Sequence, residues 1–322
     1  MRQVQKRKFR SAVSALTLAV ISIVMFLLAL QAWVFFHPRT IEPFRARIRN
    51  NKFIMMYENE YNYFLDTGFT TSTLYDSVAQ RAHDGVPIFA TFSRDATNRR
   101  KFHWTYMAHR FSADFLEVRN FSFELSDPRQ DNISSHFIPK EKRKPLVVIG
   151  ADMIRQAKWL IDFDGYWLEC FPLRTPTEGI PEIAGEPDLT LEYAHALPIL
   201  GRTYLLETNL WLDGVKIKDV VIDTGYGGEL YLEPDDMRRA FPHATGETKE
   251  GPIVTPFGKG NIRERKYRIR TATVNGLKVN DLSIRSEGIQ RKLIGMGFLK
   301  RFKYVLIDPE RKRIACYGRD TR

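Results

Sequence analysis

The pattern of hydrophobic and polar residues divides the chain into one long apolar stretch and a remainder of short apolar runs. Ser11–Phe36 reads SAVSALTLAVISIVMFLLALQAWVFF and contains no charged residue. After it, short apolar runs alternate with polar and turn-forming residues, which is typical of β-strands. We therefore expect a mostly β fold that follows a single N-terminal helix.

The apolar stretch is long enough to cross a bilayer. A hydrocarbon core needs about 20 apolar residues, whereas the apolar region of a cleaved signal peptide usually has about 7–15 and ends at a small-residue site. Leu30-Gln31-Ala32 is a poor match to such a site. We expect an uncleaved transmembrane helix over residues 11–36, with Trp33 at the membrane interface.

Basic residues lie on both sides of this helix. A short basic tail before one span is the usual signal-anchor arrangement, so we expect a cytoplasmic N-terminus and an extracytoplasmic (periplasmic or extracellular) remainder. The basic residues of 37–52 either lie against anionic headgroups or form a solvated linker.

An internal repeat occupies most of the rest of the chain. Tyr63–Gly68 (YFLDTG) resembles Val220–Gly225 (VVIDTG), and Val148-Ile149-Gly150 resembles Leu293-Ile294-Gly295. Further matches in the same order join Glu117–Phe123 with Lys278–Ile284, Pro87-Ile88 and Phe92 with Pro252-Ile253 and Phe257, Leu160–Asp162 with Leu306–Asp308, and Cys170 with Cys316. A repeat of this length indicates two copies of one structural unit.

Turn signals and prolines set the boundaries between elements. Asp213-Gly214 and Asn275-Gly276 predict two-residue hairpin turns, and Thr255–Gly260 predicts a Gly-rich hairpin tip. Short helices are expected near Met153–Ala157 and Phe298–Phe302. The expected plan is a basic tail over 1–10, a transmembrane helix over 11–36, a juxtamembrane linker over 37–49, a first lobe over 50–174, a proline-spaced linker over 175–198 and a second lobe over 199–322.

The repeated pattern resembles the retropepsin-like family of aspartic peptidases. An apolar strand ending in Asp-Thr-Gly is followed by a hairpin, then by two apolar residues, Gly and a short helix. The second copy, with IDTGYGGELYL and LIGMGFLKRFKYVLID, looks like bacterial members; the first keeps FLDTGFT and VVIG but departs between Phe92 and Phe115. Two copies in one chain resemble the bilobal arrangement of pepsins, which implies a monomeric active unit with Asp66 and Asp223 as the catalytic pair.

The chemistry of amide hydrolysis explains why two aspartates are needed. Like charges about 3 Å apart cannot both ionise, so one pKa falls and the other rises. The ionised carboxylate then activates a water, while the protonated one polarises the carbonyl of the substrate and later protonates the leaving nitrogen.

The resemblance also implies roles for the neighbouring residues. It implies that hydroxyl groups fix the two loops to each other, that glycines permit tight turns and close approach, and that two hairpins cover the substrate as flaps. The loop residues are Thr67, Gly68, Thr224, Gly225, Gly150 and Gly295, and the flap residues are Phe92, Phe257 and Gly258.

Composition narrows the remaining functions. The net charge of +11 is compatible with nucleic acid or anionic membrane, but no nucleic-acid-binding motif is present. We find no zinc spacing, P-loop, GxGxxG, GxSxG or HExxH motif, so no metal or cofactor is expected. Three functions stay open: a peptidase acting on polypeptides, a catalytically inactive peptide-binding module at the membrane, and a structural membrane protein. Whether Cys170 and Cys316 form a disulfide also stays open.

Overall fold

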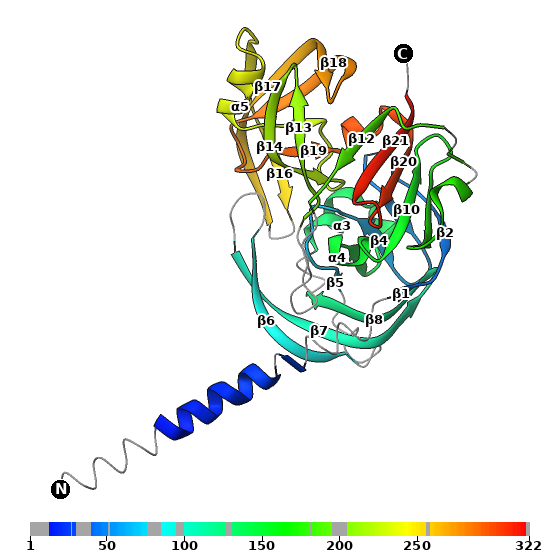
Figure 1. The fold of residues 1–322 in the computed structure, drawn as a ribbon, viewed down its shortest axis with the longest axis vertical. Helices are drawn as coiled ribbons and strands as arrows, with labels where there is room; N and C mark the ends of the chain where they lie inside the picture. Colours follow the sequence, from blue (N-terminus) through cyan, green and yellow to red (C-terminus); the bar gives the residue numbers. More distant parts are fainter. Residues whose placement is uncertain are drawn as a thin grey trace, which may run out of the picture.

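Strands dominate the protein, as predicted. The computed structural model describes residues 13–26, 28–29, 40–50, 52–75, 85–94, 100–126, 131–180, 182–183, 185–194, 205–255 and 258–319. In this part of the chain, three β-sheets form the body of the molecule, and a helix that includes residues 13–26 projects away from it (Figure 1).

Two of the sheets have the same topology. The first repeat (residues 52–172) contributes β3 (Met55–Tyr57), β4 (Asn62–Leu65), β5 (Thr73–Tyr75), β6 (Val86–Arg94), β7 (Arg100–Ala113), β8 (Leu116–Leu125) and β9 (Leu146–Ile149). The second repeat (residues 205–319) contributes β13 (Glu207–Leu212), β14 (Val215–Asp223), β15 (Leu230–Tyr231), β16 (Gly246–Thr255), β17 (Gly258–Val274), β18 (Leu277–Ser286) and β19 (Leu293–Gly295). The spatial order is β3-β4-β9-β5-β8-β7-β6 in one sheet and β13-β14-β19-β15-β18-β17-β16 in the other. The repeat in the sequence is therefore a repeat in the fold.

The third sheet joins the two repeats. Its order is β12 (Leu189–Glu192), β21 (Arg313–Arg319), β20 (Phe302–Asp308), β10 (Ala157–Asp162), β11 (Trp167–Pro172) and β2 (Phe44–Arg47). The central pair, β10 and β20, comes from different repeats and is antiparallel, with Leu160 opposite Leu306. The apolar runs that match in the sequence thus meet across the boundary between the repeats.

Two segments expected to be linkers supply strands. In the region 37–49, β1 (Thr40–Ile41) pairs with β8 and β2 pairs with β11. In the region 175–198, β12 pairs with β21. β2 and β12 each extend the last hairpin of a repeat, so their backbone groups find partners that a free linker would lack.

The helices outside the N-terminal one are short. They are α3 (Asn132–Phe137), α4 (Ala151–Ile154), α5 (Pro234–Ala240) and α6 (Met296–Leu299), with 3-10 turns at Lys140–Lys142 and Thr177–Gly179. α4 and α6 each begin two residues before the predicted start, directly after Gly150 and Gly295. The hairpin turns are as predicted: Asp213 and Gly214 have φ of 46° and 83°, and Asn275 and Gly276 have 47° and 84°, the positive values that this turn type requires.

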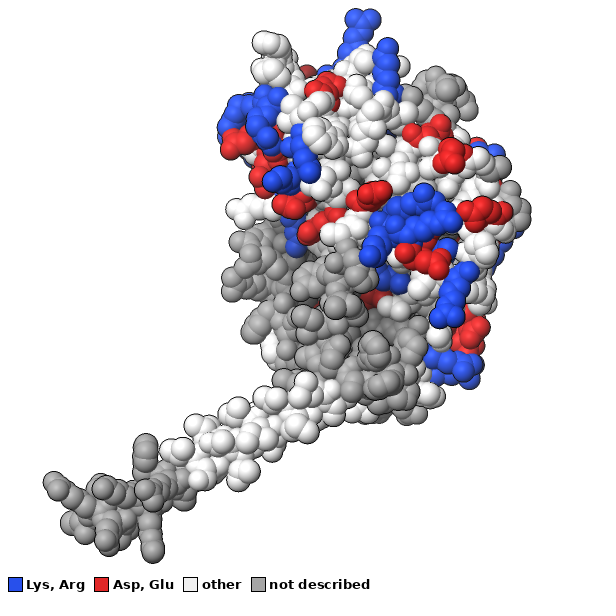
Figure 2. All heavy atoms as spheres, viewed as in Figure 1, with Lys and Arg blue, Asp and Glu red and all other residues white. Residues whose placement is uncertain are grey.

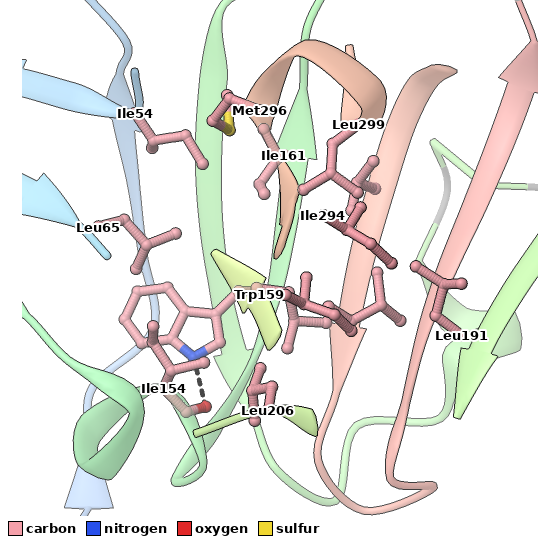
Figure 3. Packing of buried hydrophobic residues seen from close by; sticks show 14 of the residues in the cluster. Ile54, Leu65, Ile154, Trp159, Ile161, Leu191, Leu206, Ile294, Met296 and Leu299 are labelled. Atoms are coloured by element: carbon pink, nitrogen blue, oxygen red, sulfur yellow. Dashed lines mark hydrogen bonds between the residues drawn. The ribbon is translucent and has the colours of Figure 1, made fainter. Parts of the chain in front are cut away.

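One hydrophobic core extends through both repeats. Trp159 is fully buried, and its Nε1 donates a hydrogen bond to the Ile154 carbonyl at 2.8 Å. Figure 3 shows Ile54 and Leu65 from the first repeat in the same cluster as Ile294 and Leu299 from the second. The two repeats therefore share buried apolar surface, in addition to the third sheet.

The N-terminal helix is apolar on its described surface. Its large side chains are exposed, among them Leu16, Leu18, Met25 and Phe26, and the described part of the helix carries no Lys, Arg, Asp or Glu (Figure 2). Among the described residues, none of the helices combines the length and apolar character needed to span a bilayer. Residues 30–36 of the predicted span, including Trp33, lie outside the described residues.

The two cysteines are buried and not bonded to each other. Cys170 lies on β11 and Cys316 on β21, with β10 and β20 between them. Adjacent strands lie about 4.8 Å apart, so three spacings separate the two residues by about 14 Å, well beyond the reach of a disulfide. Their matched positions therefore reflect the repeat and not a covalent link.

Candidate active site

Asp66 and Asp223 occupy equivalent positions at the ends of two strands. Asp66 follows β4, and its backbone N–H donates to the Ile149 carbonyl of the parallel neighbour β9 at 3.0 Å. Asp223 ends β14 and lies opposite Gly295 of the parallel neighbour β19. The apolar residues before each aspartate bury the strand, and the neighbouring parallel strand holds the start of each loop in place.

Four hydrogen bonds fasten the two loops to each other. The backbone N–H of Thr67 donates to Thr224 Oγ1 at 3.0 Å, and that of Thr224 donates to Thr67 Oγ1 at 2.9 Å. The Thr67 hydroxyl donates to the Ile222 carbonyl at 2.5 Å, and the Thr224 hydroxyl donates to the Leu65 carbonyl at 2.8 Å. Both threonines are fully buried. Each hydroxyl therefore acts as donor and acceptor at once, and the arrangement is symmetric between the repeats.

Each carboxyl group lies against the glycine of the opposite loop. A Cβ atom added to Gly68 would lie 2.6 Å from Cγ of Asp223, and one added to Gly225 would lie 2.6 Å from Cγ of Asp66. Such distances exclude any side chain at these positions. The two carboxyl groups also influence each other, because the charge of Asp223 and a side-chain hydrogen bond with it both raise the pKa of Asp66. The structure thus brings Asp66 and Asp223 into direct contact, and the two glycines make that contact possible.

Backbone donors orient the carboxylates within their own loops. The N–H of Gly68 donates to Asp66 Oδ1 and the N–H of Gly225 donates to Asp223 Oδ1, both at 2.8 Å. One oxygen of each carboxyl group is held by its loop, which leaves the other free to face its partner.

The surroundings of the two aspartates shift their pKa values to different extents. Burial raises the pKa of Asp66 well above its usual range, and the charge of Asp223 raises it further. Burial also raises the pKa of Asp223, but the hydrogen bond with Asp66 and the charge of Arg291 act in the opposite direction. The pKa of Asp66 is therefore the more strongly raised of the two. Asp66 is 5% exposed, and Asp223 is the more accessible of the pair.

Gly150 and Gly295 let a second segment pass close to each aspartate loop. A Cβ on Gly150 would lie 2.8 Å from the backbone carbon of Thr71, and the Gly295 position is closed in the same way by the Tyr226 and Gly228 carbonyls. The helices that follow are tied to the same loops, since Ala151 N–H donates to the Phe69 carbonyl and Met296 N–H to the Tyr226 carbonyl.

Two residues that sequence reasoning missed support the first loop. The Ser72 hydroxyl donates to Asp152 Oδ1 at 2.7 Å and accepts from the Gly150 N–H at 3.0 Å. Asp152 also accepts from the backbone N–H groups of Ser72 and Met153, both at 2.8 Å. An acidic residue two positions after Gly150 was the available signal, because a buried aspartate needs such partners. The second repeat has Gly297 at the matching position and lacks this network.

Two of the three residues expected to form the flaps lie in the two long hairpins. Phe92 lies on β6 opposite Phe102 of β7, and Gly258 begins β17 opposite Thr255. Phe257 lies outside the described residues. The hairpin of the second repeat reaches the first, because β16 contacts α3. A role for Phe92, Phe257 and Gly258 in substrate binding stays a prediction.

No group of three or more His, Cys, Asp or Glu side chains that could hold a metal ion occurs in the described part of the chain. Comparison of the chain with known protein-family models and with curated proteins finds no match. The geometry of the two aspartates is therefore the feature that indicates a function. A protonated and an ionised carboxyl group in contact can activate a water molecule and polarise a carbonyl group in one step.

Proposed function

We propose that this protein is a membrane-anchored aspartic endopeptidase of the retropepsin-like kind, with its two repeats arranged as the two lobes of one active unit. The observation that carries the proposal is the contact between Asp66 and Asp223 at the meeting point of two symmetric Asp-Thr-Gly loops. A pair of buried acids that share a proton is costly to maintain in a purely structural role, because burial disfavours their ionisation.

The structure supports an assignment of roles to the two acids. Asp223, whose pKa is the less strongly raised and which is the more accessible, acts as the general base that takes a proton from the attacking water. Asp66 holds the shared proton and donates a hydrogen bond to the carbonyl oxygen of the substrate as negative charge develops there. Collapse of the tetrahedral intermediate then breaks the C–N bond, and a proton passes to the leaving nitrogen.

The symmetry of the two lobes favours a polypeptide substrate that is held in extended form between them. The hydrogen bonds of Thr67 and Thr224 across the two lobes fix the loops. The hairpins β6–β7 and β16–β17 lie at the same end of the strand order in their two sheets. The active unit is one chain, because both aspartates come from it and no second copy is required to complete the pair.

The N-terminal segment supports anchoring in a lipid bilayer. Ser11–Phe36 holds no charged residue, and the described part of the helix exposes its apolar side chains. With the basic tail in the cytoplasm, the lobes would face the extracytoplasmic side. The full chain should stay with the membrane fraction after a wash in alkaline carbonate; release into the supernatant would contradict anchoring.

Hydrolysis of a peptide library by the purified full chain tests the proposal. New peptide ends, detected by mass spectrometry, should appear with the wild type and disappear with Asp223→Asn, because an amide cannot act as the base. Asp219→Asn is the matched control, since Asp219 lies on the same strand, is exposed and has a φ of 57° that asparagine also tolerates. Cleavage that survives in a folded Asp223→Asn protein would show that the dyad is not the catalyst, and peptide binding without cleavage by the wild type would indicate an inactive binding module.

A further inference from the structure

A cavity lies between the two repeats, apart from the aspartate loops. Its volume is about 230 Å³. Its walls are Ile48 and Phe53 from the segment between β2 and β3, Phe163 and Tyr166 from the turn between β10 and β11, and Met296 and Lys300 from α6 and its C-terminal cap. The polar residues Asn50 and Asp164 also line it. Ile54, which also lines it, and Met296 both appear in Figure 3 and come from different repeats.

The two-fold repeat gives this cavity a counterpart, which can be located through matching backbone hydrogen bonds. Ile48 N–H donates to the carbonyl of Tyr166 at 2.8 Å, and Tyr193 N–H donates to that of Lys312 at 2.9 Å. Tyr166 and Lys312 both have positive φ, 59° and 54°, at the same point of matching hairpins. Ile48 in the first repeat therefore occupies the position that Tyr193 occupies before the second.

The adjoining residues match in the same way. Leu65 N–H donates to the Ile54 carbonyl at 3.0 Å, and Ile222 N–H donates to the Leu206 carbonyl at 2.9 Å. The residues one position earlier, Phe53 and Leu205, are therefore counterparts. At the helix ends, Arg155 caps α4 as Lys300 caps α6.

The counterpart site is filled by the chain itself. The Arg155 guanidinium lies 5.4 Å from the centre of the Tyr193 ring, and its Nη2 donates to the Leu205 carbonyl at 3.2 Å. The cation thus has an aromatic ring on one side and an oxygen acceptor on the other.

At the cavity, both partners of the cation are missing. Ile48 supplies no ring where Tyr193 has one, and no side chain or carbonyl group of the described residues makes an ion pair or hydrogen bond with the amine of Lys300. Lys300 is half-buried, and burial lowers the pKa of its amine. Asp164 lines the same cavity but makes no ion pair with this amine. A partly desolvated cation without a partner is unfavourable unless something else completes the site.

We propose that this cavity binds a small aromatic carboxylate, whose ring takes the place that Tyr193 fills at the counterpart site and whose acid group pairs with Lys300. The size agrees, because a cavity of about 150 Å³ accepts a benzene ring, and the remaining volume suits a short acid side arm. The aromatic walls Phe53, Phe163 and Tyr166 suit a ring. The site is independent of peptide hydrolysis, since it uses neither aspartate of the dyad.

Binding of 3-phenylpropionate to the full chain in nanodiscs, followed by calorimetry with empty nanodiscs as blank, tests the site. Saturable binding at millimolar concentration is expected, and the neutral amide of the same acid should bind roughly tenfold or more weakly, because a charge-assisted hydrogen bond is lost. Lys300→Met should abolish this preference for the acid. Lys303→Met, a nearby exposed lysine on β20, should leave binding unchanged.

A second variant tests the ring position. Ile48→Tyr restores the residue found at the counterpart site and should block 3-phenylpropionate without lowering the unfolding midpoint. A peptide with C-terminal phenylalanine that competes better than the free acid would identify peptide ends as the source of the ligand, and weaker competition would identify free acids. The proposal is overturned if the wild type shows no saturable binding, or if Lys300→Met keeps the same preference for the acid over the amide as Lys303→Met.

Discussion

The symmetric hydrogen bonds of Thr67 and Thr224 allow a prediction whose size follows from the structure. Thr224→Val keeps the shape of the side chain but removes Oγ1. The Leu65 carbonyl then loses its donor and the Thr67 N–H loses its acceptor, in a place that is fully buried. An orphaned buried polar group costs about 1–3 kcal/mol, so two of them should lower the free energy of unfolding by about 2–6 kcal/mol.

That loss is a large part of the total stability, which is about 5–15 kcal/mol for an ordinary domain. Urea unfolding of the full chain, followed through the fluorescence of tryptophans that include the buried Trp159, measures it. Thr224→Ser keeps the oxygen and should retain most of the stability. Thr208→Val is the matched control, because Thr208 is also buried but its hydroxyl makes only a 3.3 Å bond to the next residue. Thr224→Val within about 0.5 kcal/mol of the wild type, which is typical of a neutral surface change, would refute the reasoning.

Three further predictions concern the dyad, its glycines and the third sheet. The folded-state pKa of Asp66 is raised, so its contribution to stability is full below the unfolded-state pKa of about 3.9 and is lost as pH rises through the folded pKa. Between these two pKa values, the urea midpoint of unfolding should fall less with rising pH for Asp66→Asn than for the wild type. The same fall in midpoint for both proteins would contradict a raised pKa. Gly225→Ala places a Cβ against the Asp66 carboxyl group, so it should lower the free energy of unfolding by about 1–3 kcal/mol and abolish peptide cleavage. In Gly251→Ala the added Cβ meets nothing within 4 Å, so urea unfolding and the cleavage assay should both match the wild type. Lys158→Met leaves the buried Asp308 without its cation at 3.6 Å and should lower the unfolding free energy by about 3–5 kcal/mol. Lys303→Met, at an exposed lysine, should change it little in parallel urea titrations. If the two variants lose the same stability, the buried ion pair does not stabilise the fold.

The repeat in the sequence predicted much of the fold because both copies keep the same order of short apolar runs. The hairpin turns at Asp213-Gly214 and Asn275-Gly276 follow from local backbone preferences, which need no tertiary information. The match of Leu160–Asp162 with Leu306–Asp308 indicated equivalence, but it did not reveal that these strands pair with each other.

Other features depend on tertiary contacts that the sequence does not encode locally. The basic composition of the segment around Phe44–Arg47 indicated a linker. It forms a strand because β11 offers a free edge with which it pairs. The network of Ser72 and Asp152 connects residues that lie far apart in the sequence. The difference between Tyr193 and Ile48 became meaningful only when matching hydrogen bonds placed the two at equivalent positions.

The central claim is that Asp66 and Asp223 share one proton. Carbon-13 NMR titration of aspartate carboxyl groups in the full chain, assigned with Asp66→Asn and Asp223→Asn, tests it without requiring a substrate. The account predicts two coupled steps, in which the signals of both residues respond at each step and one proton remains bound well above the usual range of an aspartic acid. Two independent single-proton curves near pH 3.9, the value of an unperturbed aspartate, would contradict it.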